Sequence, residues 1–170
     1  MRLIKQQGNA DCVAAALAMV LNEWTGGGID YIKTALFSYL PKPFTGEWSD
    51  LPKVPDMNII CNWAWDSHSI ALVPFEYSPT CTPARGCPPV PVWPRNTRSG
   101  MGPEEAWLRH LSYGPGLLEG SLIGREVGHM VAWSGDAIYD PRGYIYSLNV
   151  AQEKFKFQPA RFWLAANTRK

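Results

Sequence analysis

The first strong pattern along the chain is an almost unbroken apolar run that begins just after Asp11. Apolar residues recur in it with helical spacing and alanines fill the other faces, so the run predicts a helix that is buried on nearly all sides. Three glycines, residues 26–28, predict its end, because glycine readily adopts the left-handed conformation that caps a helix. A second helical pattern covers residues 29–40 and is expected to stop at Pro41. Two helices in sequence should therefore open the fold.

The segment 41–101 reads differently, because it is rich in proline and tryptophan and shows no helical period. We expect it to be an insertion, with strands at 57–65 (MNIICNWAW) and 69–77 (SIALVPFEY) and a proline-stiffened irregular stretch at 79–100. Its aromatic side chains can line a cleft or form a small core, and the core is the favoured alternative. These aromatic residues are Trp48, Trp63, Trp65, Phe75, Tyr77 and Trp93.

Regular patterns return in the last third of the chain. Residues 102–114 predict a short helix, with Pro103 suited to its first turn and Gly114 to its end. Short β-type runs follow, separated by glycine or by turns that contain aspartate: 116–124, 128–135, 137–143, 144–149 and the alternating tail 153–158. The basic residues of the tail are expected on a solvated strand face: Lys154, Lys156, Arg161, Arg169 and Lys170. Helices first and an antiparallel sheet second predict an α+β fold.

The composition favours one compact domain over residues 1–170 and excludes some classes of function. With 46% hydrophobic and 18% charged residues, the chain can bury a core and does not resemble a disordered protein. The net charge of +1 provides no overall field for nucleic acid or an anionic membrane, so we expect neither as a partner. No apolar run is long enough to span a bilayer, and the N-terminus is too polar for a secretory signal. A soluble, cytoplasmic protein is therefore expected.

The four cysteines do not suggest a disulfide scaffold, and in a reducing compartment free thiols indicate catalysis or metal binding. A zinc site could be assembled from Cys61, His68, Cys81 and Cys87, but it would lack a tight Cys-x-x-Cys pair and is disfavoured. We expect no metal and no cofactor, which leaves Cys12 as a free thiol of interest.

Cys12 lies where the polar N-terminal segment meets the apolar run. If Asn9 or Asp11 caps the helix, Cys12 falls in its first turn, where unpaired backbone N–H groups and the helix dipole stabilise a thiolate. The Asp11 carboxylate opposes this effect, so a histidine must supply most of the stabilisation. The alternative is an ordinary packing residue, since free cysteine is among the most buried residue types.

A thiol nucleophile also needs a base that can serve as an acid, a group that orients this base, and donors for the oxyanion. His129 lies in an expected strand and Asp140 in the next, so an antiparallel pair joined by a turn at 134–136 would bring them together. Gln6 can direct its side-chain amide to the oxyanion beside the Cys12 N–H, and Gln7 is the neighbouring alternative. Taken singly, His129 could be a structural histidine and Asp140 a turn opener before proline.

Residues 6–21, QQGNADCVAAALAMVL, resemble the active-site segment of the C39-type papain-like cysteine peptidases, which reads Gln, five residues, Cys and an alanine-rich helix. The second half is similar as well, with a short helix, a strand, a histidine that opens a strand, and YDP closing the next. The resemblance covers residues 1–40 and 102–145, and it implies a papain-like fold in which N-terminal helices carry the nucleophile against an antiparallel sheet. It makes Cys12 the nucleophile, His129 the base and acid, Asp140 the orienting carboxylate and Gln6 the oxyanion donor. Family members usually have glycine after the cysteine, where this chain has Val13.

The resemblance therefore predicts a cysteine peptidase acting on a peptide or protein substrate. An amidase or acyl transferase acting on a non-peptide amide uses the same chemistry, and a non-catalytic protein-binding module can keep the same fold. The small size and the unusual insertion also suggest a phage or mobile-element protein acting in a host cytoplasm.

Overall fold

The computed structural model describes residues 1–6, 12–28, 57–76, 108–122, 128–155 and 157–168. Three helices and six strands have defined bounds: α1 (Cys12–Thr25), α3 (Met57–His68), β1 (Ile70–Glu76), β2 (Gly116–Leu122), β3 (Gly128–Trp133), β4 (Ile138–Asp140), β5 (Tyr144–Tyr146), α5 (Leu148–Lys154) and β6 (Phe157–Asn167). Residues 108–111 are also helical. The expected helices at 29–40 and at the start of 102–114 lie outside the described residues.

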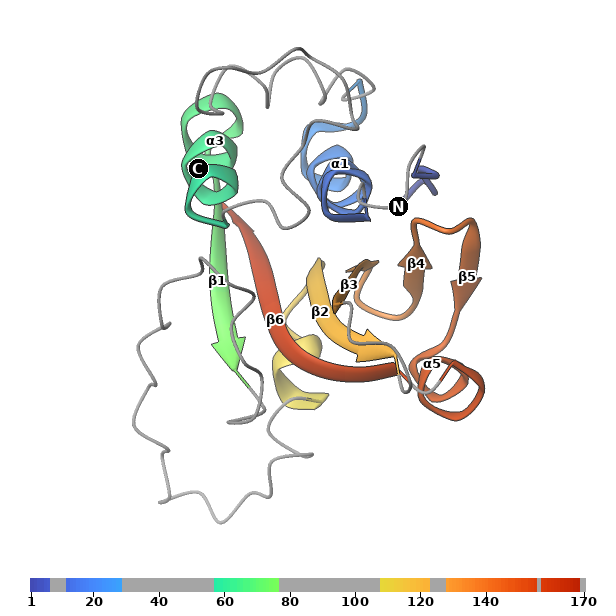
Figure 1. The fold of residues 1–170 in the computed structure, drawn as a ribbon. Helices are drawn as coiled ribbons and strands as arrows, with labels where there is room; N and C mark the ends of the chain where they lie inside the picture. The colour runs from blue at the N-terminus through green and yellow to red at the C-terminus, as the bar shows by residue number, and fades with distance from the viewer. Residues whose placement is uncertain (7–11, 29–56, 77–107, 123–127, 156, 169–170) are drawn as a thin grey trace, which may run out of the picture.

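The six strands form one antiparallel sheet in the order β1-β6-β2-β3-β4-β5. Strand β6 is long and curved, and it joins β1 on one side to β2 on the other (Figure 1). The next three pairings link strands that follow one another along the chain, which short connections permit. The expected α+β fold class with an antiparallel sheet is confirmed.

The core consists of two apolar clusters, and neighbouring residues of one strand contribute to different clusters. Leu117 of β2 belongs to the cluster under α1 and α3, and the next residue, Leu118, belongs to the cluster near α5. This division follows from the strand geometry, because successive side chains point to opposite faces of a sheet. The sheet therefore buries both faces, with α1 packed mainly against β3.

Helix α1 agrees with the sequence pattern. Its residues 14–21 are all buried, and Met1, Leu3 and Ile4 of the N-terminal segment pack against the same cluster. The helix ends at Thr25, and the three glycines that follow all have positive φ, as expected of a glycine-capped helix end. Because the helix is buried on most sides, its position in the core is fixed, and so is the position of its first residue, Cys12.

The expected strand at 57–65 is wrong, because residues 57–68 form helix α3. Met57, Ile60, Trp63 and Ala64 are buried along one side, the spacing of a helix and not of a strand. The strand expected next is confirmed as β1, which pairs with β6 along its length. Residues 57–76 are thus part of the core and the sheet, and the remainder of the expected insertion lies outside the described residues.

The C-terminal region differs from expectation in two places. Residues 148–154 form the short helix α5, which begins at the N-cap Ser147, where a continuation of β-type runs was expected. Arg161 is not on a solvated face: it is 4% exposed, and its Nη1 lies 3.2 Å from a carboxylate oxygen of Glu119 on β2. Its guanidinium also lies over the ring of Trp163, 5.4 Å from the centroid. The local polar pattern predicted a solvated side chain, but Arg161 is buried against Glu119, which lies 42 residues away in the sequence.

Gly116 is required where β2 and β6 approach each other. A Cβ atom at this position would collide with the carbonyl oxygen of Trp163 and the ring of Phe162. The glycine therefore permits the close contact of β2 with β6.

Within the ranges that the structure describes, no helix is long and apolar enough to cross a membrane.

Candidate active site

Strands β3 and β4 form a hairpin that brings together His129 and Asp140, which lie near its two ends in the sequence. Ala132 pairs with Tyr139 and Trp133 with Ile138. A tight turn closes the pair: the Ser134 N–H donates to the Ala137 carbonyl at 3.0 Å, as the predicted turn at 134–136 requires. His129 at the start of β3 and Asp140 at the end of β4 consequently lie at the same end of the hairpin.

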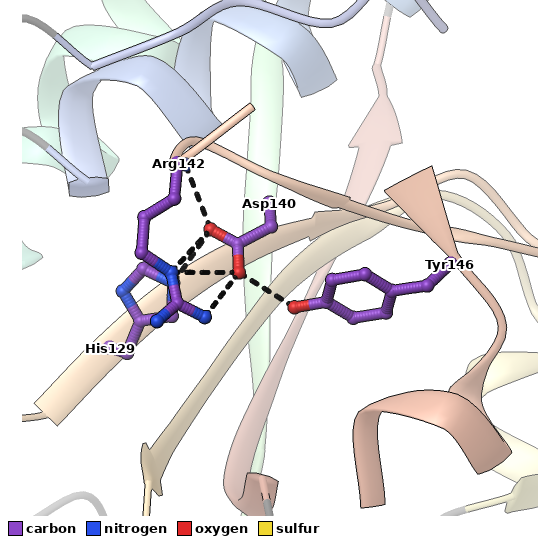
Figure 2. Close-up of polar contacts among 4 residues, drawn as sticks. All are labelled: His129, Asp140, Arg142 and Tyr146. Carbon is purple, nitrogen blue, oxygen red and sulfur yellow. Dashed lines mark hydrogen bonds and ion pairs between the residues drawn. The ribbon is translucent and has the colours of Figure 1, made fainter. Parts of the chain in front are cut away.

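The His129 and Asp140 side chains are in direct contact. Nε2 of His129 lies 2.9 Å from Oδ1 of Asp140 (Figure 2). The His129 side chain is 10% exposed and that of Asp140 is fully buried. The carboxylate can therefore fix the tautomer and the orientation of the imidazole, as expected from the spacing in the sequence.

Asp140 accepts further hydrogen bonds from two residues that the sequence analysis did not single out. Arg142 donates its backbone N–H to Oδ1 at 2.9 Å and its Nη2 to Oδ2 at 2.7 Å, with Nε near both oxygens. The Tyr146 hydroxyl donates to Oδ2 at 2.7 Å. Figure 2 shows the guanidinium and the phenol both directed at the carboxylate. Each carboxylate oxygen therefore has several donors, which removes the usual penalty of burying a charge.

Cys12 completes the arrangement from the helix side. It is the first residue of α1, half-buried and not in a disulfide. It lies close enough to His129 to contribute to the raised pKa of the imidazole. Nε2 of His129 faces Asp140, so Nδ1 is the ring nitrogen left for the thiol. The structure thus places His129 in direct contact with Asp140 and Cys12 near the same imidazole.

The charges of this cluster shift the pKa values of its members. Burial lowers the pKa of His129, but hydrogen bonds to Asp140 and Cys12 and the negative charges of both outweigh burial and raise it to about 9. Burial likewise raises the pKa of Asp140, but hydrogen bonds from His129, Arg142 and Tyr146 hold it well below its usual range. At neutral pH, His129 is therefore an imidazolium beside an ionised Asp140.

The N-terminal segment reaches the same place. The Gln6 backbone N–H donates to the carbonyl of Pro141 at 2.8 Å, directly after Asp140. The Lys5 side chain lies against Gly143 in the same turn. Gln6 is thereby tied to the turn that follows the orienting carboxylate, whereas Gln7, Asn9 and Asp11 lie outside the described residues.

The other two histidines lie in the described part of the chain, and both contact aromatic rings. His110 is stacked on Phe75, with ring centroids 4.2 Å apart, and burial and the Arg109 charge lower its pKa. His68 is the last residue of α3 and makes an edge contact with the Trp63 ring. Among the described side chains, no group of three or more His, Cys, Asp or Glu could hold a metal ion. Cys81 and Cys87, which the disfavoured zinc site requires, lie outside the described part of the chain.

Arg142 and Tyr146 carry a weaker signal in the sequence than the residues they contact. Asp140 pairs with Tyr144 in the β4–β5 register, so Tyr146 is its diagonal neighbour across the hairpin. Only a known register places Tyr146 beside Asp140, and only the tight turn places Arg142 there. The pattern YDPRGYIY indicates a hairpin, but it does not indicate which side chains converge.

Comparison with protein-family models, with curated proteins and with solved structures found no match to this chain.

Proposed function

We propose that this chain is a papain-like cysteine peptidase that hydrolyses a peptide or protein substrate. The observation that carries the proposal is the 2.9 Å contact of His129 with the buried Asp140, with Cys12 at the start of α1 close enough to raise the pKa of the same imidazole. A thiol, an imidazole and a carboxylate in this order are the groups that activate a cysteine nucleophile. The resemblance of residues 6–21 to the active-site segment of C39-type peptidases supports the same function.

The pKa of His129 defines how the reaction starts. Because that pKa is raised to about 9, the imidazole is protonated at neutral pH and can pair with a Cys12 thiolate. The thiolate attacks the carbonyl carbon of the scissile amide, and the carbonyl oxygen becomes an oxyanion. His129 then donates its proton to the leaving amine, which departs and leaves a thioester. His129, now neutral, activates water to hydrolyse the thioester.

The oxyanion requires donors close to the nucleophile. The Cys12 N–H is one, because the first N–H groups of a helix have no acceptor within the helix. The Gln6 side-chain amide is the second proposed donor, supported by the hydrogen bond that ties its backbone to Pro141. The positive end of α1 favours the same negative charge.

The proposal is tested first by thiol reactivity. We expect Cys12 to react with iodoacetamide at pH 6 at least about tenfold faster than a free thiol, because it lies beside His129 and at the positive end of α1. His129→Ala should abolish this advantage. Mass spectrometry of the labelled peptides over pH 5–9 measures the alkylation rate of Cys12. The matched control is Cys61→Ala, which removes the other free cysteine among the described residues.

Cleavage of a peptide library then tests the substrate class. Wild type and Cys61→Ala should cleave it, and Cys12→Ala should not. Ordinary reactivity of Cys12 together with equal cleavage by wild type and Cys12→Ala would exclude the proposed nucleophile. Fast alkylation without peptide cleavage would direct the search to small amides and acyl transfer to amines, whereas neither activity would favour a binding module.

A further inference from the structure

Asp140 has more hydrogen-bond donors than the orientation of His129 requires. Oδ1 receives His129 Nε2, and Arg142 contributes three nitrogen atoms to the two oxygens. Oδ2 also accepts the Tyr146 hydroxyl. These donors come from separate positions: the turn after β4 supplies Arg142, and β5 supplies Tyr146. The number of donors on this one fully buried carboxylate therefore exceeds what the Cys12–His129–Asp140 arrangement alone requires.

The first effect of these contacts is geometric. A carboxylate held only by His129 can rotate about its χ2 bond, which has a broad energy profile. The Arg142 guanidinium donates to both oxygens, Nε to Oδ1 and Nη2 to Oδ2, and Tyr146 fixes Oδ2 from the other strand. Oδ1 is therefore kept toward His129 while the imidazole moves its proton.

The second effect is electrostatic. An unopposed buried carboxylate beside His129 would hold the imidazolium proton strongly and make it a poor acid for the leaving amine. Arg142 places a positive charge against the same carboxylate, with Nη2 at 2.7 Å. Asp140 from β4 and Cys12 from α1 raise the pKa of His129. Arg142 from the turn and Tyr146 from β5 contact Asp140, and Lys5 from the N-terminal segment lies against Gly143 in the same turn. Cys12 and Asp140 favour the imidazolium, and the Arg142 charge acts against this through its pairing with Asp140.

We propose that Arg142 and Tyr146 act as positioning residues that clamp Asp140, and that the Arg142 charge keeps Asp140 from holding the His129 proton too tightly. This inference rests on the proposed function, because it describes how the same site would regulate its acid. The clamp is formed by residues of this chain alone and needs no substrate to be present. The imidazole titration of His129 therefore tests it independently of turnover.

The test is an NMR titration of the His129 imidazole, combined with steady-state kinetics on a peptide that the wild type cleaves. Arg142→Gln should move the His129 midpoint upward by about 0.5–1 pH unit, because Asp140 loses its counter-charge. It should lower kcat about tenfold at similar KM, because the carboxylate is no longer held in one orientation. Tyr146→Phe keeps the ring, which packs 4.8 Å from that of Phe155, and should produce smaller changes of the same sign.

Two further variants separate charge from structure. Arg142→Lys keeps the charge but loses the fork, so the His129 midpoint should stay within about 0.3 pH unit of wild type while kcat falls. Arg2→Gln removes an exposed arginine and should change neither quantity. If Arg142→Gln does not fold, the His129 midpoint and kcat of Arg142→Lys and Tyr146→Phe still test the proposal.

An unchanged or lowered His129 midpoint in Arg142→Gln would overturn the charge role. Unchanged kcat in both Arg142→Lys and Tyr146→Phe, with a lower thermal midpoint, would reduce the clamp to a structural feature while the peptidase proposal stands. Shifted midpoints in a protein that cleaves no peptide would support the clamp and refute the proposed function. The two proposals can therefore fail separately.

Discussion

The two sides of the candidate site are held in place by different forces. On the helix side, Cys12 is positioned by the buried apolar run 14–21 of α1. On the hairpin side, Asp140 is positioned by hydrogen bonds from His129, Arg142 and Tyr146. Apolar packing has no direction and fixes only where a helix begins, whereas hydrogen bonds fix the orientation of individual groups.

This difference suits the two chemical tasks. A thiolate is nearly spherical and needs only to be near its target, so the placement of α1 is sufficient for Cys12. An imidazole that transfers protons must present defined nitrogen atoms in defined directions. Changes on the helix side should therefore lower stability alone, and changes on the hairpin side should lower stability and activity together.

The largest effect is expected for Asp140→Ala. It leaves the imidazolium of His129 and the guanidinium of Arg142 without their buried counter-charge, which typically costs about 4 kcal/mol of unfolding free energy. Peptide cleavage should also fall by about 10³-fold or more, because the imidazole loses its orienting group. Urea denaturation at pH 7 and initial rates measure the two quantities.

Asp136→Ala is the matched control for this prediction. Asp136 is an exposed aspartate of the same hairpin, in the turn between β3 and β4. It should cost far less stability and leave cleavage unchanged. Equal losses of stability and cleavage in the two variants would show that the hydrogen bonds of the buried Asp140 contribute no more than those of an exposed aspartate.

The residues on the two sides also differed in how far the sequence could predict them. Helix α1 and its glycine end were predictable because the signals are local: apolar periodicity followed by residues 26–28. The spacing of His129 and Asp140 was predictable because a two-strand hairpin needs only a turn signal. Arg142 and Tyr146 were not, because Arg142 depends on the tight turn after β4 and Tyr146 on the register of β5, and no short pattern specifies either.

The errors elsewhere in the fold have similar causes. The strand expected at 57–65 was wrong because β-branched and aromatic residues favour a strand locally, whereas burial of every third or fourth side chain selects helix α3. Arg161 was placed on a solvated face because its partner, Glu119, lies on another strand. Long-range partners decide such cases, and a single sequence does not show them.

A smaller effect on stability is expected for Leu17→Ala, which tests the helix side. Leu17 is a fully buried residue of α1. Removing such a side chain typically lowers the unfolding free energy by about 3 kcal/mol, because a cavity remains. The alkylation rate of Cys12 in the folded protein should stay within about twofold of wild type, because the start of α1 keeps its place. Urea denaturation and iodoacetamide labelling without urea check both expectations.

Trp24→Ala on the same helix is the control for Leu17→Ala, since Trp24 is 38% exposed and should cost less stability. A large drop in Cys12 reactivity in Leu17→Ala would mean that packing also tunes the chemistry. The division between the two sides would then not hold.

The smallest effect is the pH dependence of stability, which isolates the His129–Asp140 pair. The experiment uses Cys12→Ala, because a cysteine thiol titrates in the same range. The pKa of His129 in the folded protein lies above its unfolded value near 6.5, and Asp140 is the first cause of that increase. The pair therefore adds its full stability below about pH 6.5 and loses it as the pH rises through the raised pKa of His129, which lies below about 9 in Cys12→Ala because the contribution of Cys12 is gone.

We expect the unfolding free energy of Cys12→Ala to fall by about 2 kcal/mol between pH 6.5 and 9.5. Urea denaturation at half-unit pH steps measures the slope. Cys12→Ala with His129→Gln should show a much shallower slope over this range, because glutamine does not titrate and the remaining thiols are common to both proteins. The same slope in both proteins would assign the pH dependence to another group, and the hairpin side would then owe its stability to Arg142 and Tyr146 and not to the imidazolium.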